Sequence, residues 1–85
     1  MDGIKVLIVD DEERMTRVIA DYLKIKGYDT AEAADGEEAL RQFAAFKPDL
    51  VLLDVMMPKM DGWEVCSRIR QQSSVPIIIL TARGE

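Results

Sequence analysis

The chain has 85 residues, of which 48% are apolar, with one Cys and no His. This length allows one small domain, expected over residues 1–85. A lone cysteine excludes an internal disulfide, and the lack of histidine excludes a Ser-His-Asp triad within the chain. No apolar run reaches the roughly 18 residues of a membrane span, and residue 2 is an acid where a signal peptide is basic, so we expect a cytoplasmic protein.

The net charge of −5 belongs entirely to the first half of the chain. Residues 1–43 hold 11 acids and 6 bases, whereas residues 44–85 hold 5 of each. A surface of this sign repels nucleic acid and can attract a cation. We therefore expect no direct nucleic-acid contact by this segment.

The first half predicts a strand, a helix and a second strand. Residues 4–9 are a short apolar run, typical of a strand buried on both faces. Residues 13–26 carry apolar side chains at helical spacing, and Gly27 follows where the helix should end. Residues 28–33 alternate weakly and predict a strand. The apolar residues of the expected helix are Met15, Val18, Ile19, Tyr22 and Leu23.

The second half repeats this alternation. Asp35 opens an Asp-x-x-Glu capping box for a helix that should end near residue 46, and Asp61 opens another. Residues 50–53 and Ile77–Leu80 are apolar and predict two further strands. Strands that alternate with helices predict an α/β fold with a parallel sheet, right-handed crossovers and helices on both faces.

Polar side chains follow three of the four expected strands. Asp10 and Asp11 follow the first strand, Asp54 the third and Thr81 the fourth. Ligands bind parallel sheets at the carboxyl ends of the strands. Clustered carboxylates repel one another unless a cation holds them, and a set of oxygens without His or Cys suits Mg²⁺. If these strands are neighbours, Asp54 could attack phosphorus and Thr81 could donate a hydrogen bond to a phosphoryl oxygen.

Each of these residues also has an ordinary explanation. Asp10 and Asp11 could cap the first helix, Asp54 could belong to a turn, and Thr81 could simply end a strand. Their joint occurrence at three strand ends of one sheet favours a site.

Three stretches, IVDDEE, LLDVMMPKMDG and IIILTARGE, closely resemble the receiver domain of bacterial response regulators. The pattern Asp54-x-Met-x-Pro58-x-Met-x-Gly62 is the most specific, and the resemblance runs through all 85 residues. It implies a flavodoxin-like, doubly wound sheet with strand order 2-1-3-4.

The resemblance also implies roles for residues. Asp54 would be the phosphoacceptor and a histidine kinase the phosphoryl donor, in a signalling protein rather than an enzyme. Asp11, Asp54 and the backbone carbonyl of Met56 look like Mg²⁺ ligands, with Asp10 acting partly through water. Thr81 resembles the switch residue that moves toward the phosphoryl group. The ending LTARGE is similar to receivers of transcription factors, which implies a transcriptional output domain outside this chain.

The sequence departs from the family after the fourth strand. The family's fold continues with a fifth strand, further helices and a strand-five lysine, for which residues 1–85 contain no counterpart. We therefore expect a truncated receiver whose phosphorylation is impaired. Without a fifth strand, Ile77–Leu80 would be an apolar edge, so we expect self-association or a complementing chain there.

Two other readings remain open. The chain could be a structural or engineered half-domain that assembles through the edge of strand four. It could also be a haloacid-dehalogenase-like phosphohydrolase, which uses an aspartate nucleophile at a strand end. That class has a second Asp two residues after the nucleophile, and here Met56 stands at that position.

Overall fold

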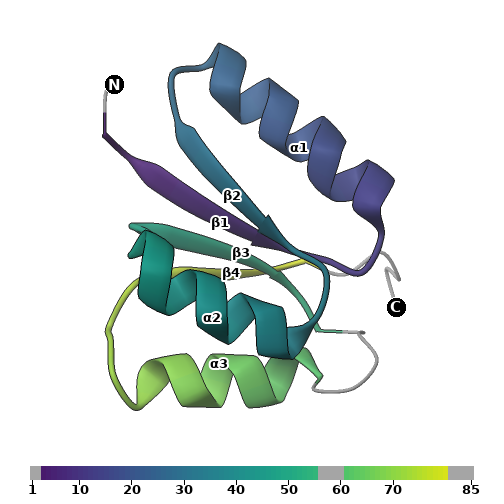
Figure 1. Cartoon of the computed structure of the whole chain (residues 1–85). Coiled ribbons are helices and arrows are strands. Elements are labelled where there is room, and N and C mark those ends of the chain that lie inside the picture. The colour runs from purple at the N-terminus through teal and green to yellow at the C-terminus, as the bar shows by residue number, and fades with distance from the viewer. Residues whose placement is uncertain (1–2, 56–60, 81–85) are drawn as a thin grey trace.

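The computed structural model describes residues 3–55 and 61–80. Strands and helices alternate along them (Figure 1). The seven elements are β1 (Lys5–Val9), α1 (Glu13–Ile25), β2 (Asp29–Ala33), α2 (Gly36–Phe46), β3 (Leu50–Asp54), α3 (Gly62–Arg70) and β4 (Ile77–Leu80). The strands form one parallel sheet in the order β2-β1-β3-β4, which confirms the predicted fold class and strand order. Among the described residues, no helix combines the length and apolarity needed to cross a membrane.

The sheet lies between two unequal helical layers. Helices α2 and α3 cover one face, and α1 alone covers the other (Figure 1). The larger core lies on the side of α2 and α3, where Leu7, Val51 and Leu53 meet Val65 and Ile69. On the opposite face, the sheet residues Val6 and Ile8 pack with Ala20 of α1. Strand β1 is therefore buried on both faces, as its apolar run predicts.

Two helices begin at the predicted capping residues. The Asp35 carboxylate accepts a hydrogen bond from the Glu38 backbone N–H at 2.8 Å, and Asp61 accepts one from that of Glu64 at 3.0 Å. Glu38 also reaches back and accepts from the Ala34 N–H at 3.0 Å. These contacts satisfy N–H groups that the first turn of a helix leaves without partners.

Helix α1 carries two apolar stripes, and only one of them faces the sheet. Ile19 and Leu23 pack against the sheet around Ala20, as their spacing predicts. The side chains of the second stripe are exposed to solvent in the described part of the chain. They are Met15, Val18, Tyr22 and Ile25. The spacing alone could not separate the stripes, because the small side chains of Thr16 and Ala20 are the ones that α1 buries most deeply.

Strand β4 lies at one edge of the sheet and pairs, in the described part of the chain, with β3 alone. Its central side chains remain accessible, since Ile78 is 49% and Ile79 is 36% exposed. Strand β4 is therefore apolar, as predicted, and also lies at an edge of the sheet.

Candidate metal and phosphoryl site

Three carboxylates meet at the carboxyl ends of β1 and β3. These strands are parallel neighbours in which Val9 lies opposite Leu53, so Asp10 follows β1 beside Asp54, the last residue of β3. One carboxylate oxygen from each of Asp10, Asp11 and Asp54 lies within 4.8 Å of the others. The structure thus brings together three of the residues predicted from sequence. Met56 and Thr81 fall outside the described residues, and their predicted roles stay predictions.

Asp10 is the most enclosed of the three carboxylates. It is 9% exposed, and its Oδ1 accepts a hydrogen bond from the Glu12 backbone N–H at 2.9 Å. Its own N–H donates to the Ala33 carbonyl oxygen of β2 at 3.1 Å, which ties the end of β1 to its neighbour. The contact with Glu12 was not predicted from the sequence, although an Asp side chain that accepts from the backbone N–H two residues later is a known turn-forming contact.

The surroundings of Asp10 oppose its negative charge. Burial raises the pKa of this carboxyl above its usual range, the Glu12 N–H partly lowers it, and the negative charges of Asp54 and Asp11, with a hydrogen bond to Asp54, raise it further. A cation held among the three carboxylates would attract them, and so would oppose the rise in the pKa of Asp10 that their mutual repulsion causes.

The donor set fits Mg²⁺. All three groups are carboxylates, and hard oxygens are the ligands that this ion prefers. One carboxylate oxygen from each residue lies within 4.8 Å of the other two, so a single cation could be held among them. Exposure also increases from Asp10 to Asp54 to Asp11, so the cluster opens to solvent.

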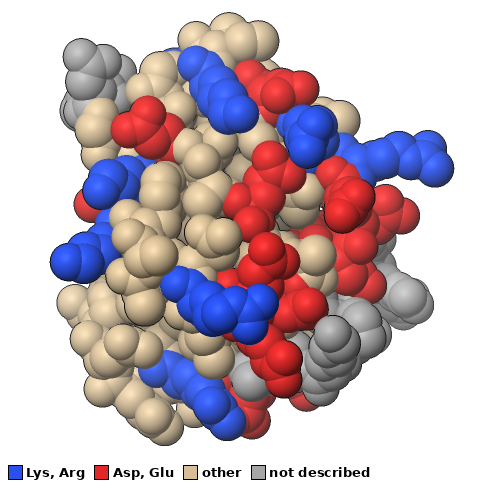
Figure 2. All heavy atoms as spheres, in the orientation of Figure 1, with Lys and Arg blue, Asp and Glu red and all other residues tan. Residues whose placement is uncertain are grey.

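One face of the molecule is rich in acidic side chains. Figure 2 shows acidic side chains gathered in a band on one face, with basic side chains beside it.

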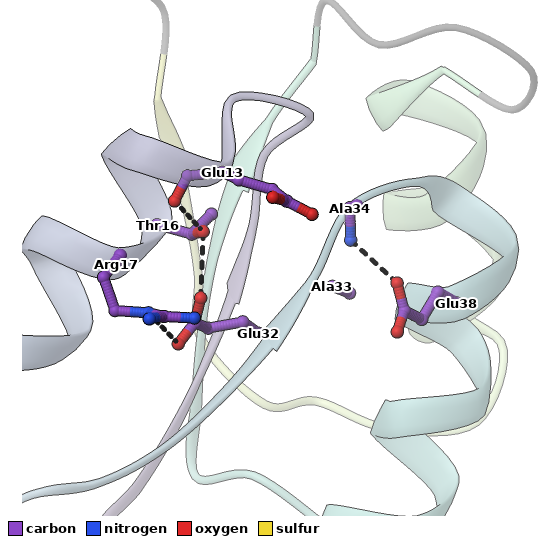
Figure 3. Close-up of a pocket in the computed structure, with 7 residues that line it drawn as sticks. All are labelled: Glu13, Thr16, Arg17, Glu32, Ala33, Ala34 and Glu38. Atoms are coloured by element: carbon purple, nitrogen blue, oxygen red, sulfur yellow. Dashed lines mark hydrogen bonds and ion pairs between the residues drawn. The ribbon is translucent and has the colours of Figure 1, made fainter.

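A polar cavity of about 160 Å³ lies between α1, β2 and α2 (Figure 3). There Thr16 and Arg17 of α1 point toward Glu32 of β2, with Oγ1 to Oε1 at 3.0 Å and Nε to Oε2 at 3.6 Å. Glu32 is thus held by contacts within the chain.

Comparison with known proteins identifies the class to which this fold and site belong. The family described as the response regulator receiver domain matches residues 6–85. The match covers nearly the whole chain, and the chain belongs to this family.

Named relatives agree with this assignment. The chain is 54% identical over 85 residues to a probable transcriptional regulator ycf27 of Porphyridium aerugineum, covering all of this chain and 35% of the relative. It is 51% identical over 82 residues to the alkaline phosphatase synthesis transcriptional regulatory protein PhoP of Bacillus subtilis (strain 168), covering 95% of this chain and 34% of PhoP. The chain therefore spans about a third of the length of these curated relatives.

A solved structure shows the same fold. The response regulator protein TrrA of Thermotoga maritima, crystallised in complex with Mg²⁺-BeF, matches with a TM-score of 0.89 and 38% identity. The match covers 96% of this chain and 72% of the TrrA chain. The described residues are thus a flavodoxin-like receiver fold through its fourth strand.

Proposed function

We propose that this chain is the phosphoryl-accepting part of a two-component signalling protein, with Asp54 as the phosphoacceptor. The observation that carries the proposal is the meeting of Asp10, Asp11 and Asp54 within 4.8 Å at the ends of adjacent strands. Asp54 is half-buried at the rim of the sheet, where a donor molecule can approach it. Membership of the receiver family supports the same role.

In the proposed reaction, a carboxylate oxygen of Asp54 forms a bond to the phosphorus of a phosphohistidine on a histidine kinase. The P–N bond breaks, its electron pair stays on the imidazole nitrogen, and that nitrogen takes up a proton from water. The products are an aspartyl phosphate and a neutral histidine. The chain acts here as a stoichiometric acceptor rather than as an enzyme.

Asp10, Asp11, Asp54 and the backbone carbonyl of Met56 would hold Mg²⁺, with Asp10 acting partly through water. When bound, the ion would neutralise charge on the transferring phosphoryl oxygens. Thr81 would donate a hydrogen bond to one of those oxygens. TrrA, crystallised with Mg²⁺-BeF, provides a precedent within the same fold.

The output and location are also part of the proposal. Both curated relatives are named transcriptional regulators, which supports a transcriptional output controlled by this receiver. A reducing, cytoplasmic location is supported by the single cysteine, Cys66, which is free.

A phosphorylation assay tests the proposal. The protein, at its full natural length, is incubated with acetyl phosphate and Mg²⁺ and followed by intact mass. We expect the gain of one phosphoryl group, which Asp54→Asn abolishes because the amide is not a nucleophile, and which a chelator of Mg²⁺ strongly slows. Asp21→Asn, which removes an exposed carboxylate of α1, is the matched control and should be modified like the wild type. Equal modification of wild type and Asp54→Asn would refute the assignment.

A second proposal, from the exposure of Ile78 and Ile79, is that the edge of β4 pairs with a second copy of this chain or with a complementing chain. A row of unpaired backbone groups on an apolar strand invites such pairing. A two-fold axis perpendicular to the sheet would make the two β4 strands antiparallel.

A further inference from the structure

The first turn of α3 lies directly against the backbone of Asp54 and Val55. The Gly62 N–H donates to the Val55 carbonyl oxygen at 3.1 Å, and Gly62 is itself buried. The Asp61 carboxylate caps the same turn through the Glu64 N–H. The start of the helix is therefore fixed both to its own cap and to the chain that leaves β3.

Only glycine fits at this contact. A Cβ added at Gly62 would lie 2.7 Å from the Asp54 carbonyl oxygen and 2.9 Å from Val55 Cγ1, and it would meet Val55 Cα more closely still. Real Cβ atoms essentially never approach other atoms within 3.0 Å. Two of these neighbours are backbone atoms, which cannot rotate away as the end of a side chain can.

Neither side of the contact can yield easily. On one side, Val65 and Ile69 hold α3 in the core, and both are fully buried. On the other side, β3 is paired with β1 and β4, and the pairing with β4 ends at Asp54. The peptide that joins Asp54 to Val55 lies just beyond the last pair, so strand pairing restrains it less than the residues before it. A displaced Asp54 carbonyl would move the Asp54 Cα to which it is joined, and with it the carboxylate.

We infer that Gly62 is a positioning residue for Asp54. By letting α3 approach the peptide between Asp54 and Val55, Gly62 sets the direction of the Asp54 carboxylate relative to Asp10 and Asp11. The inference rests on the proposed function, because it assigns to Gly62 the geometry of that same site. Gly62 touches neither the metal nor the phosphoryl group and acts only through the backbone of residues 54 and 55.

Gly62→Ala tests this role, and Gly36→Ala is its matched control. Gly36 is also the buried first residue of a helix, and the Asp before it caps a Glu N–H in the same way, but it opens α2, which holds no proposed ligand. Mg²⁺ affinity is measured by calorimetry, and the acetyl phosphate rate is measured at saturating Mg²⁺, both on protein of full natural length. We expect Gly62→Ala to weaken Mg²⁺ binding about tenfold and to slow modification by about 10- to 100-fold, with changes below about twofold for Gly36→Ala.

The outcomes separate this inference from the proposed function. If the wild type neither binds Mg²⁺ nor is modified at Asp54, the proposed function fails. If the wild type does both and Gly62→Ala stays within about twofold of Gly36→Ala, then α3 shifts instead of the peptide and only the positioning role is wrong.

Two further measurements cover a variant that does not fold well. Trimethylamine N-oxide, which favours folded states, is added equally to all proteins if Gly62→Ala is partly unfolded. Val55→Ala removes the Cγ1 contact but leaves the backbone spacing, so it should keep the wild-type Mg²⁺ affinity. If Val55→Ala weakens Mg²⁺ binding as much as Gly62→Ala does, packing of the Val55 side chain positions Asp54, and the role of Gly62 is refuted.

Discussion

Asp10 makes the fold less stable when it is ionised, a cost that its proposed role in holding Mg²⁺ would account for. Its carboxyl is buried beside Asp54 and Asp11, so its pKa lies above that of the unfolded chain. Between those two pKa values the folded chain binds a proton more tightly than the unfolded chain does. The free energy of unfolding therefore falls as pH rises through that window, and the loss is complete above the folded pKa. A bound cation would offset it.

At the residue scale, we predict that Asp10→Asn stabilises the chain in Mg²⁺-free buffer at neutral pH. The amide removes the opposed charge and keeps an oxygen that can accept from the Glu12 N–H. Urea unfolding at several pH values should show this gain shrinking as pH falls through the wild-type pKa, because the wild-type carboxyl is then protonated. Asp21→Asn should show no such pH-dependent gain. A loss of stability for Asp10→Asn at neutral pH would contradict the sign of the effect.

At the scale of the element, α2 begins with a reciprocal arrangement. Asp35 accepts from the Glu38 N–H, while the Glu38 carboxylate accepts from the Ala34 N–H, so the turn between β2 and α2 is fixed at both ends. At its other end, α2 stops at Lys47, which has a left-handed φ of 53°. Local contacts thus define both ends of this helix, and Asp35 could be recognised from its sequence.

We predict that Asp35→Ala lowers the free energy of unfolding by about 1 kcal/mol, within the usual range of about 0.5–2 for an N-cap. The reason is that the Glu38 N–H loses its acceptor in the first turn. Chemical denaturation measures the change, with Asp21→Ala in the middle of α1 as the control, which should shift stability by less than about 0.5 kcal/mol. An effect of Asp35→Ala no larger than this control would show that the cap contributes little.

At the scale of the whole molecule, the sheet is covered unequally. Helices α2 and α3 lie over one face and α1 over the other (Figure 1), and β4 keeps an open edge in the described part of the chain. A domain of this size has only about 3–5 kcal/mol of stability from its core. Exposed apolar strand edges in such a domain promote association.

We therefore predict that residues 1–85 alone self-associate at micromolar concentration through β4. Sedimentation should show dimers or larger species for the wild type and mainly monomers for Ile78→Lys, because a charge on the strand disfavours pairing. Val18→Lys is the matched control, since it replaces an exposed apolar side chain on α1 instead. If the wild type is a monodisperse monomer that melts cooperatively, or if Val18→Lys alone dissociates the assembly, the role of β4 is wrong.

The sequence by itself determined the order of the elements and the residues at the strand ends. Apolar runs separated by capping residues are local signals, so the strands at Leu50–Asp54 and Ile77–Leu80 and the caps at Asp35 and Asp61 could be placed without a structure. The observed strands begin or end within one residue of the predictions. The acidic residues that follow β1 and end β3 were recognisable for the same reason, because their positions follow from where each apolar run stops.

Only the tertiary structure decided which residues meet and which stay exposed. The approach of the three carboxylates to within 4.8 Å of one another depends on the pairing of β1 with β3, which are separated in sequence by α1, β2 and α2. The exposure of the second apolar stripe of α1, to which Tyr22 belongs, depends on which face of α1 meets the sheet. The need for glycine at residue 62 depends on how closely α3 approaches Val55. Each of these features depends on how two separate elements pack against each other. The periodicity of apolar residues along one element carries no information about that packing.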